Sequence, residues 1–247
     1  MSSLDAPARP ATREAGPQAR PHPGLFATTA AVLRKELRLE LRTLESVPGM
    51  SLFGVTTFVV FHFALNRATV EGDLAAGILV ATLLFSAMLG INRLWVVENE
   101  QGGFDGFLLA PVDRTALLLA KAAALTTYLL VLELVAIPAF ALLLLGPPLW
   151  PAFGELVAVL LLVDAGLAVV GTLTSALAVR TRARDLLAPL LTLPLLVPVV
   201  LAGARALSPV LAAHHGEPAT KWLLLLGLYD LVFGLVAFAV FDFLLAD

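Results

Sequence analysis

Six long apolar runs dominate the pattern of the chain. They cover approximately residues 49–66, 74–96, 116–145, 153–178, 186–206 and 221–245. A helix needs about 20 apolar residues to cross the hydrocarbon core of a bilayer, so each run can span, although the first is short. The connections between the runs are too short for a soluble domain. The pattern therefore predicts an all-α integral membrane protein, with six transmembrane helices in one membrane domain over residues 25–247.

The segment before the first run has the pattern of a different kind of helix. Over residues 26–46, apolar side chains recur at helical spacing: Phe26, Ala30, Leu33, Leu37, Leu41 and Leu44. A row of basic residues lies beside this stripe: Arg34, Arg38 and Arg42. Glu36 and Glu40 flank its other edge. This pattern is typical of an amphipathic helix in the headgroup plane, which either only anchors the chain or also touches a cytoplasmic partner.

The amino-acid composition agrees with a chain that is surrounded by lipid. Hydrophobic residues make up 59% of the chain and charged residues 14%, the net charge is -3, and the mean hydropathy is +0.92. These values exclude a nucleic-acid-binding domain and most soluble enzymes, because such a chain cannot cover its surface with polar groups. Residues 1–24 are rich in proline and lack an apolar core, so we expect a disordered tail and no signal peptide. The chain contains no cysteine.

The basic residues predict the orientation. Thirteen of the 16 Lys and Arg residues lie in the N-terminal segment and in the connections after the second and fourth runs. The other side of the membrane holds only Arg67, Arg205 and Lys221. Because cytoplasmic loops carry the excess of Lys and Arg, both termini are predicted to be cytoplasmic, with the protein in the inner membrane.

The connection after the second run is unusually apolar for a cytoplasmic loop. Residues 98–114, here called the 98–114 loop, combine Phe104, Phe107, Leu108 and Leu109 with three acidic residues, Glu98, Glu100 and Asp105. They could form a short amphipathic helix that Pro111 ends. The helix would either dip into the bilayer surface or dock into a cleft on a cytoplasmic protein. The acidic residues favour docking, because anionic headgroups would repel them.

Two motifs resemble those of the CcmB family, the membrane subunits of an ABC-type haem exporter used in cytochrome c maturation. The first comprises Glu98, Gly103, the run from Leu108 to Arg114, and Lys121. The second comprises Gly171-Thr172-Leu173, the basic segment 180–187, and Pro189, Pro194 and Pro198. The similarity extends over about residues 30–245.

This resemblance implies a permease that works with other chains. The expected partners are a cytoplasmic ABC ATPase docked on the 98–114 loop, a haem-handling membrane subunit and a second copy of the chain, all within membrane lipid. ATP would bind only to the partner, since the chain has no G-x-x-x-x-G-K-[ST] motif and is not expected to be an enzyme. Haem would be cargo or a neighbouring ligand. The coupled step would be haem export or release of a haem-loaded chaperone. A general ABC-2-type drug or lipid exporter and a non-transporting scaffold are the alternatives.

Several residues inside the runs are candidates for function. Glu133, Asp164 and Asp230 are too costly to face lipid, so we expect interhelical hydrogen bonds or a role in transport. Counting along the runs places Asp164 and Asp230 at similar depth and Glu133 nearer the midplane.

The prolines and histidines allow two further predictions. The three prolines of the fifth run predict a hinge or a broken helix. His62, His214 and His215 could ligate haem iron, but solvated or structural roles are the more usual ones. No catalytic group and no metal site is predicted.

Overall fold

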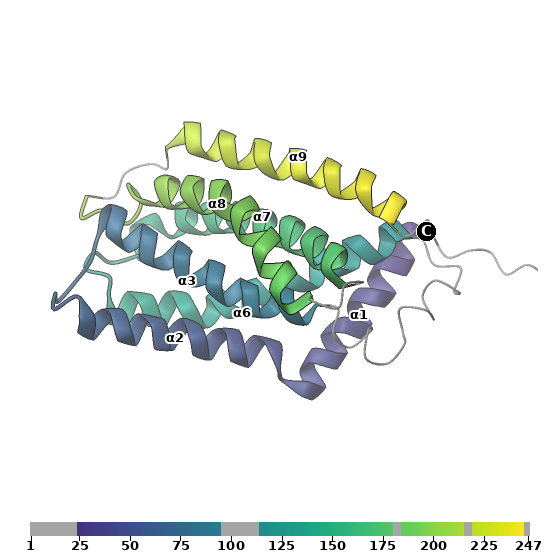
Figure 1. Cartoon of the computed structure of the whole chain (residues 1–247). Coiled ribbons are helices and arrows are strands. Elements are labelled where there is room, and N and C mark those ends of the chain that lie inside the picture. The colour runs from purple at the N-terminus through teal and green to yellow at the C-terminus, as the bar shows by residue number, and fades with distance from the viewer. Residues whose placement is uncertain (1–23, 95–113, 180–183, 215–218, 245–247) are drawn as a thin grey trace, which may run out of the picture.

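Six apolar helices run side by side through the molecule (Figure 1). The computed structural model describes residues 24–94, 114–179, 184–214 and 219–244. Each of the six helices is long and apolar enough to cross a membrane: α2 (Ser46–Ala64), α3 (Gly72–Arg93), α6 (Arg114–Leu143), α7 (Phe153–Val179), α8 (Arg184–Leu207) and α9 (Thr220–Leu244). The prediction of an all-α protein with six spans is confirmed, with ends that shift by a few residues.

Two of these helices form the centre and two lie at the edges. α3 and α7 are the most buried of the six, whereas α2 and α9 expose most of their surface. α9 runs along one side of the bundle and α2 along the opposite side (Figure 1). The exposed face of α9 is apolar, with Leu228, Leu231, Leu235 and Phe238. Such a face suits contact with lipid tails or with another membrane chain.

Small residues bring the central helices into close contact. A Cβ atom at Gly171 of α7 would lie 2.6 Å from the Ile91 side chain of α3. Asp164, Ala168 and Ser175 lie on the same face of α7, and they are buried as expected for a packing face. Glycine at position 171 therefore allows α3 and α7 to pack more closely than a larger residue would.

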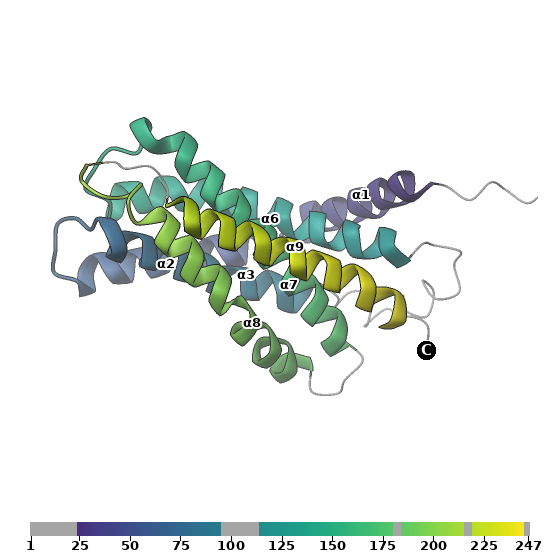
Figure 2. The same ribbon diagram turned by 90° about the horizontal axis from the view of Figure 1, so that it is seen from above.

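α8 continues as one helix through Pro189, Pro194 and Pro198, and its axis bends (Figures 1 and 2). A proline inside a helix removes a backbone hydrogen bond and displaces the preceding turn. In the turn between the second and third prolines, the Leu195 carbonyl accepts a hydrogen bond from the Tyr229 hydroxyl of α9. The bend is thus supported by a neighbouring helix. A hinge motion at this bend stays a prediction.

The N-terminal helix, α1 (Leu25–Thr43), lies at a steep angle to the six spans, at the end of the bundle where α9 ends (Figure 1). It packs against α6. Its buried face consists of Thr28, Val32, Glu36 and Glu40. The prediction that these two glutamates flank a lipid-facing stripe is wrong. Both side chains point into the protein, where they meet polar partners. Phe26, at the start of the apolar stripe, is 86% exposed.

Candidate functional site

A buried lysine joins three helices at the end of the bundle that carries α1. Lys121 of α6 is fully buried, and its Nζ donates hydrogen bonds to Glu36 Oε2 of α1 at 3.0 Å and to the Leu94 carbonyl at 2.8 Å. A buried cation of this kind is stable only when it is paired and hydrogen-bonded. Lys121 therefore holds α1, α6 and the end of α3 in one arrangement.

The α1–α2 corner is fixed in the same way. Glu40 Oε1 accepts hydrogen bonds from the backbone N–H groups of Ser46 and Val47, at 2.9 and 2.8 Å. These donors belong to the first turn of α2 and have no partner within the helix. Beside this cap, Arg93 of α3 makes a 2.8 Å ion pair with Glu45. We call Glu36, Glu40, Glu45, Arg93 and Lys121 the corner network.

The corner network lies where the chain leaves α3 toward the 98–114 loop. Leu94, whose carbonyl Lys121 binds, is the last described residue before that loop. The predicted docking residues lie outside the described part of the chain: Glu98, Glu100, Gly103, Phe104, Asp105, Phe107, Leu108, Leu109 and Pro111. Sequence reasoning did not find the Glu36–Lys121 pair. The available signal was a lysine seven residues inside an apolar helix.

The three intramembrane carboxyl groups lie at similar distances along their helices from one end of the bundle. Glu133 is ten residues before the end of α6 at Leu143, Asp164 is eleven after the start of α7 at Phe153, and Asp230 is ten after the start of α9 at Thr220. A rise of about 1.5 Å per residue puts each about 15 Å along its helix from that end. The greater depth of Glu133 in the membrane stays a prediction.

The interhelical hydrogen bonds expected for these groups are not all present. Asp164 is fully buried, yet within the described residues neither of its carboxyl oxygens has a hydrogen-bond partner. The same holds for Asp230 Oδ1 and Glu133 Oε1. A Cβ atom at Gly166 would lie 2.7 Å from Asp230 Oδ1, which shows how closely α7 approaches that carboxyl. Asp164 is near enough to Glu133 for the two to repel when both are ionised.

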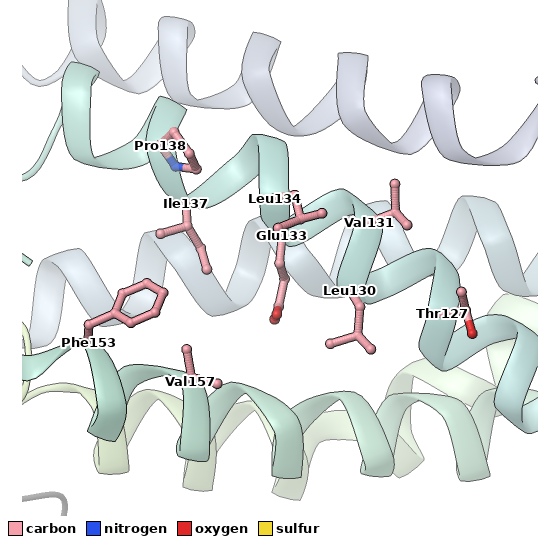
Figure 3. Close-up of a pocket in the computed structure, with 9 residues that line it drawn as sticks. All are labelled: Thr127, Leu130, Val131, Glu133, Leu134, Ile137, Pro138, Phe153 and Val157. Carbon is pink, nitrogen blue, oxygen red and sulfur yellow. The ribbon is translucent and has the colours of Figure 1, made fainter.

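Glu133 also borders a cavity between α6 and α7 (Figure 3). The cavity has a volume of about 360 Å³. Its apolar lining comes from both helices: Leu130, Val131, Leu134 and Ile137 of α6, and Phe153 and Val157 of α7. Thr127 and Pro138 complete the wall on α6. In Figure 3 the Glu133 side chain points from α6 into the space between the two helices.

The two histidines that the structure describes, His62 and His214, do not gather into a metal site. His62 Nδ1 lies 2.5 Å from the Leu143 carbonyl, so this nitrogen carries the proton and links α2 to α6. His214 is exposed in the connection after α8, and His215 lies outside the described residues. Over the described ranges, no group of three His, Cys, Asp or Glu residues could hold a metal ion. Haem ligation by any of the three histidines stays a hypothesis.

Six spans, a transverse N-terminal helix and a buried network at the loop end define a multi-pass α-helical membrane protein. The family model described as CcmB protein matches residues 27–245, and the chain belongs to the CcmB family. The resemblance seen in the two motifs is thus confirmed.

Curated relatives in several bacteria carry the name Heme exporter protein B. That of Rhodobacter capsulatus is 35% identical over 179 residues, which cover 71% of this chain and 80% of the relative. That of Paracoccus denitrificans is 33% identical over 215 residues, covering 85% and 94%. That of Pseudomonas aeruginosa is 29% identical over 211 residues, covering 85% and 92%. The similarity thus extends over nearly the full length of two of these three relatives.

Proposed function

We propose that this chain is the permease subunit of an ABC-type haem exporter that serves cytochrome c maturation in the bacterial inner membrane. The observation that carries the proposal is the CcmB match over residues 27–245, with relatives named Heme exporter protein B. The six apolar helices supply the membrane domain that such a subunit needs. The names of the relatives favour haem over a drug or a lipid as cargo.

The 98–114 loop is proposed to receive the force of ATP hydrolysis from a separate ATPase. An apolar helix face with acidic neighbours suits a cleft on a protein better than an anionic membrane surface. At the exit of α3 toward this loop, Lys121 is bound to the Leu94 carbonyl and to Glu36 of α1. A displacement of the loop would therefore be passed to α1 and α6 together, and through Arg93 and Glu45 to the start of α2.

The assembly and orientation belong to the same proposal. One copy provides one such loop, so two copies would be needed to engage a pair of ATPase chains. The exposed faces of α2 and α9 leave room for the second copy, for a haem-handling membrane subunit and for lipid. Both termini would face the cytoplasm, as the basic residues indicate. The driven step would be haem export itself or release of a haem-loaded chaperone.

Replacement of one apolar loop residue tests the docking. Leu108→Asp places an unpaired charge in the proposed contact, which costs several kcal/mol when the charge is buried. We expect the ATPase to be lost from the purified complex while the permease still inserts at the normal level. Gln101→Asp adds the same charge at a polar position of the loop and should keep the ATPase bound. Equal recovery of the ATPase with both variants would refute the docking of the loop.

A further inference from the structure

The cavity between α6 and α7 opens toward the lipid side of the bundle. Leu134 and Phe153, two of its lining residues, are 75% and 43% exposed. Its volume of about 360 Å³ falls in the range of small-molecule sites. A molecule dissolved in the bilayer could therefore enter it from the side, without passing through the aqueous phase.

One wall of this apolar cavity carries a strong polar group. Glu133 is only 7% exposed, and no donor among the described residues reaches its Oε1. A buried carboxyl oxygen without a partner is costly in an apolar medium. A ligand that supplies a donor at this point would remove that cost. A lipid acyl chain would fill the cavity but leave Oε1 without a partner.

Glu133 is the acidic residue that lines the cavity, and a second carboxyl group lies near it. Asp164 of α7 interacts with Glu133, and it has no hydrogen-bond partner of its own within the described residues. Two carboxyl groups in a medium of low dielectric constant favour a positive charge between or beside them. Within the described residues no lysine or arginine lines the cavity to supply that charge.

We propose that the α6–α7 cavity binds an apolar molecule that carries one protonated amine, with its ammonium group on Glu133 and its apolar body against Leu130, Ile137, Phe153 and Val157. The ammonium group would donate to Oε1 and neutralise the carboxylate. The apolar body would replace lipid in the cavity. The site is independent of the 98–114 loop and of the cargo proposed above.

A compact amine provides the test. A fluorinated adamantylamine is titrated against the full-length chain in lipid nanodiscs, and fluorine NMR measures bound and free probe. We expect saturable binding to the unmodified chain. Glu133→Gln should weaken it by about tenfold or more, because the ammonium group then meets a neutral amide acceptor in place of a carboxylate and the ion pair is lost. Adamantanol, with the same shape and no charge, should displace the amine poorly.

Two further variants separate loss of the site from loss of the fold. Val157→Phe should block the probe while leaving Glu133 in place, since it fills the cavity from α7. Asp230→Asn removes a carboxyl that does not line the cavity, and it should bind the probe like the unmodified chain. Thermal melting confirms that each variant is folded. Wild-type affinity in Glu133→Gln, equal competition by adamantanol, or no saturable binding to the unmodified chain would each overturn the proposal.

Discussion

Among single residues, Lys121 connects three helices at the loop end of the bundle. It pairs with Glu36 and binds the Leu94 carbonyl, and it is fully buried. Lys121→Met would remove the 3.0 Å partner of the buried Glu36 carboxylate and leave its longer contact to Lys35, at 3.4 Å. Breaking a buried ion pair by removing one partner costs about 3–5 kcal/mol. We expect a clearly lower melting temperature in detergent, measured by tryptophan fluorescence.

Two further variants show whether the pair itself matters. The double variant Lys121→Met with Glu36→Met should recover part of the loss, because it leaves no unpaired charge behind. Lys221→Met removes an exposed lysine near Trp222 and should melt close to the unmodified chain. Equal melting temperatures for Lys121→Met and the unmodified chain would contradict the role of the corner network.

The sequence predicted these residues only in part. The spacing of α1 placed Glu36 and Glu40 on one side of the helix, but periodicity alone does not say which side meets another helix. Their burial depends on Lys121 and on the first turn of α2, which lie 85 and about six residues away along the chain. Glu133, Asp164 and Asp230 were recognisable as intramembrane carboxyls. Which of their oxygens have a partner among the described residues depends on how the helices face one another.

At the scale of helices, the contact of α3 with α7 depends on the residue at position 171 being glycine, which has no side chain. A Cβ atom at Gly171 would lie 2.6 Å from Ile91, whose side chain is fully buried. Gly171→Ala should therefore destabilise the bundle by about 1–3 kcal/mol, the usual cost of overpacking. Gly227→Ala of α9 is the matched control, since nothing lies within 4 Å of its added Cβ. Thermal melting of the two variants side by side measures the difference, and equal melting would contradict the close packing.

The helices themselves were largely predictable. Apolar runs of sufficient length gave all six spans, because only helices can cross a bilayer with every backbone group paired. The three prolines of α8 predicted a hinge or a broken helix, whereas the structure contains a continuous bent helix. The hydrogen bond that the Tyr229 hydroxyl donates to the bend could not be foreseen. Tyr229 belongs to another helix and lies 34 residues further along the chain than its partner Leu195.

For the whole molecule, the orientation in the membrane can be tested directly. The chain contains no cysteine, so single cysteines report their own side without a background. Thr43 at the end of α1 and Ala213 after α8 are both exposed and lie at opposite ends of the bundle. Ala213→Cys should react with a membrane-impermeant maleimide in intact cells with a permeable outer membrane, and Thr43→Cys should react only after lysis. The reverse pattern would refute the cytoplasmic placement of the termini.

Family and architecture were accessible from the sequence, because motif and hydropathy are both local properties of the chain. The corner network and the α6–α7 cavity were not, since each joins residues from separate helices. Together they describe a permease whose loop end is held by a buried ion pair and whose lipid-facing side carries a separate pocket.

The most direct test is the amount of covalently bound haem in c-type cytochromes, seen by haem staining of gels. Cells from which the gene for this chain has been deleted should lose holocytochrome c, and a plasmid copy of the unmodified chain should restore it. Leu108→Asp should reach the same membrane level by immunoblot without restoring holocytochrome c. A deletion strain that keeps its full amount of holocytochrome c would contradict the proposed role of the protein in haem export.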